Sequence, residues 1–131
     1  MYEMKKEYYT GIELVDNEHL QLFDYANQIY ELLHDDYVAD KYDNIKDLLQ
    51  KLTDYAEQHF ADEEAYMESI HYKRLFTQKI QHQEFINSLS KYDLDEIDRM
   101  ENKDVVISEL LTFVTDWLIS HILNVDTLIG K

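Results

Sequence analysis

The chain is 131 residues long, enough for one domain with a substantial core, and it contains no cysteine. Disulfide bonds and thiolate metal sites are therefore excluded, so any metal must be bound through nitrogen and oxygen atoms. Acidic residues outnumber basic ones by 28 to 12, for a formal net charge of −16, and such a surface repels phosphates, so neither nucleic acid nor a membrane is expected as a partner.

The first predicted helix follows an irregular N-terminal arm, residues 1–15, in which Gly11 is the flexible point. Asp16 is a residue type that caps helix N-termini, and the helix is expected to run to about His34. Apolar residues recur along this segment at helical spacing, at positions Leu22, Phe23, Ala26, Tyr30 and Leu33.

The second and third helices are predicted from the same periodicity. The second follows an acidic loop at residues 35–40, is capped by Asp40 or Asp43, and ends near Met67. Its apolar positions are Ile45, Leu48, Leu49, Leu52 and Ala56. After a connection at residues 68–73, the third helix carries the apolar residues Leu75, Phe85, Ile86 and Leu89.

A fourth helix follows a polar loop predicted at residues 92–103 and is capped by Asn102 or Asp104. Its apolar positions are Val106, Leu110, Val114, Trp117 and Leu118. Four amphipathic helices with short connections, in a chain without proline, predict an all-α fold. We expect an up-down-up-down antiparallel four-helix bundle that forms a single domain over residues 1–131. No signal peptide or membrane-spanning run is recognised, so a cytoplasmic protein is expected.

Residues that commonly bind metals interrupt the apolar stripe of every predicted helix. A buried polar group without a partner costs about 1–3 kcal/mol, so such interruptions require that the groups satisfy one another or a metal. In an antiparallel bundle, the start of the first helix lies level with the end of the second, the start of the third and the end of the fourth. The side chains expected to meet in this layer are His19, His59, Glu63, His82, His121 and Asp126.

The spacing of His121 and Asp126 is unusual for a core feature. Residues five apart lie about 140° apart on a regular α-helix, so both can face the core only where the helix widens into a π turn or ends. Imidazoles and carboxylates without thiolates favour iron, with manganese and zinc as alternatives. His34, at a helix end, and His71, about 16 Å along the helix axis from His82, are expected to lie outside the site.

Three segments combine these residues with fixed neighbours: Gly11-Ile12-x3-Asp16-x2-His19, His59-Phe60-x2-Glu63-Glu64 and Trp117-Leu118-x2-His121-Ile122-x3-Asp126. Together they resemble the hemerythrin family, and the resemblance covers nearly the whole chain. It implies two non-haem iron ions with an oxo or hydroxo bridge, and reversible O2 binding for storage, delivery or sensing. It also implies that the irons are bridged by Glu63 and Asp126, that the iron with an open position is bound by His19 and His59, and that the other is bound by His82 and His121.

One position departs from the family. Where its members have a second histidine four residues before His82, this chain has Gln78, whose neutral amide oxygen is a weaker iron ligand. We expect the Gln78 side chain to face the metals. The iron beside it is expected to be under-coordinated, or to take water or a weak bond to the Gln78 oxygen. Ligands such as azide, NO or peroxide are then expected besides O2.

The sequence leaves three functions open. Reversible O2 binding, which would make the protein a carrier and not an enzyme, is the preferred interpretation. The substitution at Gln78 raises the alternative of a redox-active di-iron site that consumes O2 or peroxide as an oxidase or peroxidase, or that binds NO. The third is a metal-free bundle that acts as an interaction protein. No particular protein partner follows from the sequence.

Overall fold

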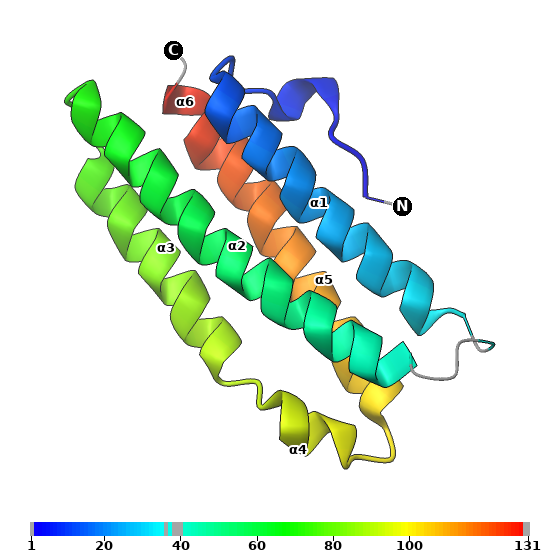
Figure 1. Ribbon diagram of the computed structural model, residues 1–131. Helices are drawn as coiled ribbons and strands as arrows, with labels where there is room; N and C mark the ends of the chain where they lie inside the picture. The colour runs from blue at the N-terminus through cyan, green and yellow to red at the C-terminus, as the bar shows by residue number, and fades with distance from the viewer. Residues whose placement is uncertain (1, 36, 38–40, 130–131) are drawn as a thin grey trace.

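Four long antiparallel helices dominate the computed structural model, which describes residues 2–35, 37 and 41–129 (Figure 1). The helix α1 packs against both α2 and α5, and α2 packs against α3. Beyond α5 the chain continues without a break through a π-helical turn, η2, into the short helix α6. The predicted all-α bundle is confirmed, with bounds α1 Glu13–Leu33, α2 Lys41–Ser69, α3 Leu75–Ser90, α5 Lys103–His121, η2 Ile122–Asp126 and α6 Thr127–Ile129.

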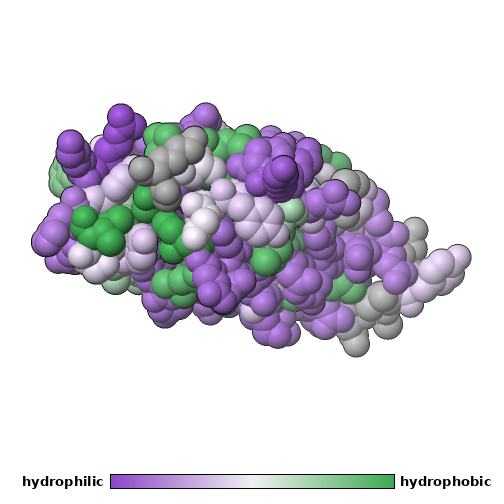
Figure 2. All heavy atoms as spheres, turned by 90° about the horizontal axis from the view of Figure 1, so that it is seen from above, coloured by the Kyte–Doolittle hydropathy of each residue, from purple (hydrophilic) through white to green (hydrophobic). Residues whose placement is uncertain are grey.

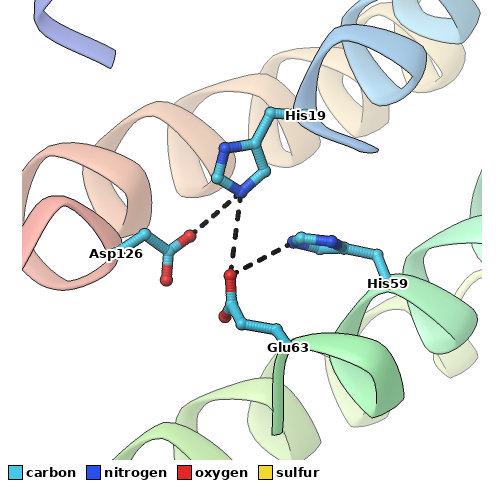
Figure 3. A group of neighbouring side chains, drawn as sticks. All are labelled: His19, His59, Glu63 and Asp126. Carbon is cyan, nitrogen blue, oxygen red and sulfur yellow. Dashed lines mark ion pairs between the residues drawn. The ribbon is translucent and has the colours of Figure 1, made fainter. Parts of the chain in front are cut away.

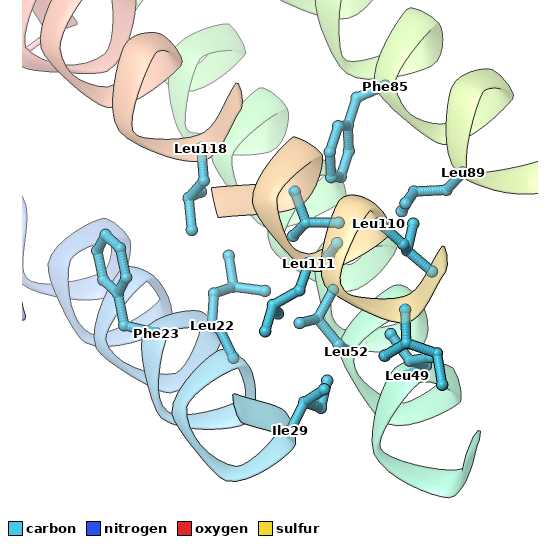
Figure 4. Close-up of a cluster of buried hydrophobic side chains, with 14 of the residues drawn as sticks. Leu22, Phe23, Ile29, Leu49, Leu52, Phe85, Leu89, Leu110, Leu111 and Leu118 are labelled. Atoms are coloured by element: carbon cyan, nitrogen blue, oxygen red, sulfur yellow. The ribbon is translucent and has the colours of Figure 1, made fainter. Parts of the chain in front are cut away.

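The core lies between the four long helices and is built from their apolar stripes (Figure 4). In α1 the stripe is centred on Ile29, which is fully buried, whereas Tyr30 packs against the edge of the core and is only partly buried. This differs from the expected stripe, because an aromatic ring with a hydroxyl group is more favourably placed where its polar end reaches water. The other buried residues of the cluster include Leu22, Phe23, Ala26, Leu49, Leu52, Phe85, Leu110 and Leu118.

The start of α1 differs from the prediction, because Asp16 lies inside the first turn of the helix and is not its N-cap. The helix begins at Glu13, and Ile12 precedes it without a side-chain capping hydrogen bond. The Asp16 carboxylate instead accepts hydrogen bonds from N and Oγ1 of Thr10, both at 2.8 Å, and from N of Gly11 at 3.2 Å. Gly11 has a φ of 85°, a left-handed conformation that glycine adopts without strain. The carboxylate thereby fixes the tight loop that leads into the helix.

The rest of the arm is more ordered than the sequence indicates. It contains the short 3-10 helix η1, Lys6–Tyr8, and the Tyr8 side chain is buried against Phe23 with ring centroids 6.0 Å apart. At its start, the backbone N and O of Tyr2 pair with the side-chain amide of Asn27. The arm is therefore held along α1 at several points.

The connections between helices show two further differences. The predicted polar loop at residues 92–103 contains a helix, α4 (Leu94–Asp98), because the Asp93 side chain accepts hydrogen bonds from two backbone N–H groups in its first turn. Ile97 from this helix is buried in the core. Asn102 occupies the N-cap position of α5 but makes no side-chain capping bond, and Asp104 lies in the first turn. Of the caps predicted for α2, Asp40 lies outside the described residues and Asp43 falls in the first helical turn.

The segment from Lys103 to Ile129 is long and apolar enough to cross a membrane when length and composition alone are considered, contrary to our expectation that no such stretch exists. Such a composition also suits the core helix of a bundle, and 44% of its most apolar window is buried in this structure. The surface seen in Figure 2 is mainly hydrophilic, with separate hydrophobic patches.

The direction of the helices determines where polar core residues meet. One end of the bundle contains the start of α1, the end of α2, the start of α3 and the continuation of α5 through η2 (Figure 1). Side chains near these four points, although far apart in sequence, share one layer of the core.

Candidate metal centre

The side chains expected to bind metal converge in this layer. All six are buried, and they form two groups in which one ligand-type atom from each residue lies within 4.8 Å of the others. Both groups contain Glu63 and Asp126. The remaining members form the pairs His19 with His59 and His82 with His121. The structure therefore presents two neighbouring sets of donors that share both carboxylates.

Glu63 directs a different oxygen toward each histidine pair. Its Oε2 lies 3.5 Å from Nε2 of His59 and 3.9 Å from Nε2 of His19 (Figure 3). Its Oε1 lies 3.1 Å from Nε2 of His82. The i,i+4 spacing of His59 and Glu63 on α2 places both on one helix face, so both side chains enter the layer from the same helix.

Asp126 has the same divided arrangement on the opposite side of the layer. Its Oδ2 lies 3.1 Å from Nε2 of His19, and its Oδ1 lies 3.1 Å from Nε2 of His121. Asp126 reaches this position because it ends the π-helical turn η2. A π turn bonds each residue to the fifth one along, so residues five apart share a face. The widening predicted from the spacing of His121 and Asp126 is confirmed.

The outer nitrogens of three histidines contact polar residues to which the sequence analysis assigned no role. Each Nδ1 lies within hydrogen-bond distance of an oxygen on a neighbouring helix: His59 to Glu18 at 2.9 Å, His82 to Glu64 at 2.7 Å and His121 to Gln81 at 3.0 Å. A neutral imidazole that donates its Nδ1 proton outward keeps a free lone pair on Nε2. These contacts therefore orient the rings and direct the Nε2 lone pairs into the layer.

These outer partners follow a regular pattern along the chain. Each is adjacent in sequence to a site residue on its own helix and supports the histidine of the next long helix. Glu18 precedes His19, Glu64 follows Glu63, and Gln81 precedes His82. A polar neighbour beside a buried donor was the sequence signal that could have identified them.

His19 is the exception to this pattern. Its Nδ1 makes no hydrogen bond within the described part of the chain. By analogy with the other three, its partner would lie beside His121 on α5. There Ile122 is apolar and buried, and Ser120 is exposed.

Gln78 lies at the edge of the same layer, one helical turn before His82. It is fully buried, and its side-chain amide donates from Nε2 to Oδ1 of Asp126 at 3.2 Å. The structure thus places Gln78 against the site, as expected from its position on α3. Its amide nitrogen thus contacts a carboxylate that both donor groups share.

Two aromatic rings cover the pair formed by His82 and His121. Phe60 stacks on His82 with ring centroids 4.0 Å apart and an interplanar angle of 8°. Trp117 stacks on His121 at 4.5 Å and 11°, and it also stacks on Phe85. These rings fix the imidazole planes and cover one face of each ring with apolar surface.

The pKa values of the two shared carboxyl groups shift in opposite directions. Burial raises the pKa of Glu63 well above its ordinary value, and the negative charge of nearby Asp126 raises it further. Burial also acts to raise the pKa of Asp126, but the close imidazoles of His121 and His19 outweigh it and leave that pKa below its ordinary value. Without a cation, these opposite shifts favour a proton on Glu63 over one on Asp126. A pair of cations would allow both groups to ionise.

Burial favours the neutral forms of His59 and His82. It lowers the pKa of His82 to about 4, against the opposing effect of Glu64, and it lowers the pKa of His59 well below its ordinary value. The pKa of Glu18 is raised to about 8 by burial and by Asp62, with which it shares a hydrogen bond. A protonated Glu18 can donate to Asp62 and still accept from His59 through Oε1. Neutral imidazole is the form that binds metal.

The donor atoms fit a pair of cations better than they fit one another. The buried side-chain nitrogen and oxygen atoms without a hydrogen-bond partner in the described residues all lie in this layer: Nδ1 and Nε2 of His19, both carboxylate oxygens of Glu63, Oε1 of Gln78 and Oδ2 of Asp126. Each such atom costs about 1–3 kcal/mol. Four imidazole nitrogens and two carboxylates, without sulfur, form a donor set suited to iron, manganese or zinc.

The two remaining histidines lie outside the layer. His34 is exposed at the end of α1, where its Nδ1 contacts the carbonyl oxygen of Tyr30 at 2.9 Å. His71 is exposed in the turn between α2 and α3. Neither belongs to a donor group among the described residues, as the sequence indicated.

Comparison with known proteins agrees with this geometry. Residues 10–131 match the family model described as the hemerythrin HHE cation binding domain. The chain belongs to the hemerythrin HHE family. It is 45% identical over 126 residues to a bacteriohemerythrin from Clostridium acetobutylicum, covering 96% of each chain. It is 33% identical over 117 residues to a bacteriohemerythrin from Pseudomonas paraeruginosa, covering 89% of this chain and 71% of that one.

The hemerythrin family is also apparent in the fold. The crystal structure of wild-type hemerythrin superimposes with a TM-score of 0.77 and 25% identity, covering 99% of this chain and 95% of that one. Both curated relatives are named bacteriohemerythrins, and neither name denotes an enzyme. The family and the four-helix fold predicted from the sequence are confirmed.

The position of Glu63 predicts opposite effects on the metal-free and the metal-loaded protein. Replacing Glu63 with leucine removes two buried oxygens that have no hydrogen-bond partner. The free energy of unfolding of the metal-free variant should therefore equal that of the wild type or exceed it, by up to about 1–3 kcal/mol. The same change should abolish most metal binding and the stabilisation that metal provides. Urea unfolding with and without added zinc measures both effects.

The exposed Glu57 on the same helix provides the control, since Glu57→Leu should leave zinc binding unchanged. If Glu63→Leu retains two metal ions per chain, then Glu63 does not bridge them.

His82 should make the metal-free protein sensitive to acid. Its pKa is about 4 in the folded state, whereas an unfolded histidine titrates near 6.5, so the unfolded state binds the proton first as the pH falls. The contribution of His82 to the free energy of unfolding should thus decrease between pH 6.5 and about 4, by about 3 kcal/mol in total. Urea unfolding of the wild type and His82→Gln across this range isolates that contribution.

The control is His34→Gln, which alters an exposed histidine and should show little pH-dependent difference from the wild type. Parallel stability curves for the wild type and His82→Gln would show that His82 is not held neutral by the fold.

Proposed function

We propose that the protein binds O2 reversibly at a pair of non-haem iron ions held by His19, His59, Glu63, His82, His121 and Asp126. This proposal rests on the position of the two carboxylates, because each of them directs one oxygen to each histidine pair. When bound, two ferrous ions would supply the electrons that O2 accepts on binding. The oxo or hydroxo bridge between them is inferred from the family.

The residues of the chain would position the metals, balance their charge and limit the access of water. Nε2 atoms of the four histidines would bind the metals, and their orientation is fixed from outside by Glu18, Glu64 and Gln81. Ionised Glu63 and Asp126 would offset much of the metal charge in a layer from which water is excluded. The stacked rings of Phe60 and Trp117 limit the access of water, which favours reversible binding over loss of reduced oxygen.

The relatives support the same function. Family membership indicates a cation-binding domain, and a bacteriohemerythrin is 45% identical over 96% of the chain. The metal-free alternative is disfavoured by the buried atoms that lack partners in this layer.

A second candidate function rests on Gln78. Its amide occupies a place where a stronger ligand would close the coordination of the metal between His82 and His121. A more open metal site favours turnover with O2 or peroxide, as in an oxidase or peroxidase, or the binding of NO. This candidate requires the same two irons and differs from the first in what happens after O2 arrives.

The first experiment measures iron content and the response to O2. Protein loaded anaerobically with ferrous iron should contain two irons per chain, develop a visible absorption band in air, and lose that band when O2 is removed. The variant His34→Ala, altered outside the site, should behave like the wild type. Failure to bind any transition metal would contradict the proposal, whereas a band that decays with release of peroxide would favour the oxidase.

A further inference from the structure

We infer that the metal position between His82 and His121 has an exchangeable ligand site beside Gln78, which takes water or a small monoanion. The inference rests on the proposed di-iron function and adds a second ligand site to it. It means that both metals, and not one, are open to small molecules from solution.

The two donor groups contain the same kinds and numbers of ligands. His19 and His59 serve one position and His82 and His121 serve the other, and each position receives one oxygen from each shared carboxylate. Neither group contains a further histidine or carboxylate among the described residues. Two imidazoles and two carboxylate oxygens leave an octahedral iron incomplete, so the same deficit exists on both sides.

The Gln78 amide is oriented by its hydrogen bond to Asp126. Its nitrogen lies 3.2 Å from Oδ1 of Asp126, and an ionised carboxylate can only accept hydrogen bonds, so the atom facing Asp126 is the NH2 group. The amide oxygen is then directed elsewhere. The donor bond to Asp126 competes with coordination by Gln78, because turning the oxygen toward the metal would break that bond.

The amide oxygen of Gln78 is left without a partner in the buried layer. Oε1 of Gln78 is buried and has no hydrogen-bond partner, which costs about 1–3 kcal/mol. A water or hydroxide ion on the adjacent metal could donate a hydrogen bond to this oxygen. The unpartnered acceptor thus indicates where the exchangeable ligand lies.

A route from solvent leads toward this side of the layer. A groove of about 520 Å³ between α2 and α3 is lined in part by Phe60, Glu64, Lys79 and His82. The charged residues that line it are Glu57, Glu64 and Lys79, so Lys79 is the cation that a small anion would meet there. The groove therefore brings solvent to the outer side of His82, one residue away from the donor layer.

The experiment counts azide ions bound to the diferric protein, by calorimetry and by visible titration in parallel. The wild type should bind two azide ions per chain. Gln78→His, which adds a nitrogen donor one turn before His82, should bind one. The control is Gln50→His, which makes the same substitution at an exposed position of α2 away from the site and should still bind two.

A further variant keeps the test valid if Gln78→His does not fold, as judged by circular dichroism. Gln78→Leu can neither coordinate nor donate, and it should retain two azide sites. One azide ion per wild-type chain would overturn the inference and leave the proposed function intact. Two azide ions in Gln78→His would also overturn it, because the second site would then not lie beside residue 78. Absence of iron would contradict the proposed function itself.

Discussion

The structure depends on one electrostatic constraint: two carboxyl groups and four imidazoles share a dry layer at one end of the bundle. In that layer burial and the nearby Asp126 raise the pKa of Glu63, so ionising both carboxyl groups is unfavourable without positive charge nearby. Several of the donor atoms also lack hydrogen-bond partners. Two cations would resolve both problems, because each would accept lone pairs that the protein leaves free and would balance the carboxylate charge.

This constraint explains why the site lies within an otherwise apolar core. The layers below it, with residues such as Ile29, Leu52 and Leu110, provide the burial that stabilises the bundle. That stability allows one layer to be arranged for metal binding at a cost to the metal-free fold. The N-terminal arm reinforces the same end, since the Asp16 carboxylate fixes the loop that starts α1 just before His19.

Helical periodicity was sufficient to predict the bundle and the residues that meet in this layer. His19 and His59 lie on the apolar stripes of their helices, and antiparallel direction places them at one level. The spacing of His121 and Asp126 even indicated the π turn, because no regular α-helix directs both into the core. These features follow from local geometry, which a single sequence contains.

Other features depend on tertiary contacts that periodicity does not encode. Asp16 is a residue type that caps helices, but its carboxylate binds the preceding loop. The helix α4 forms because Asp93 caps a turn that also buries Ile97. The contacts of Glu18, Glu64 and Gln81 depend on the rotation of each helix relative to its neighbour. The donor orientation of Gln78 depends on Asp126, which lies 48 residues away.

The central claim is that two metal ions share Glu63 and Asp126. A crystal structure of the iron-loaded protein, with anomalous differences measured at the iron edge, tests it most directly. The account predicts two iron peaks, one beside His19 and His59 and one beside His82 and His121, with the two oxygens of Glu63 on different ions. A single peak, or two peaks with both Glu63 oxygens bound to the same ion, would contradict it.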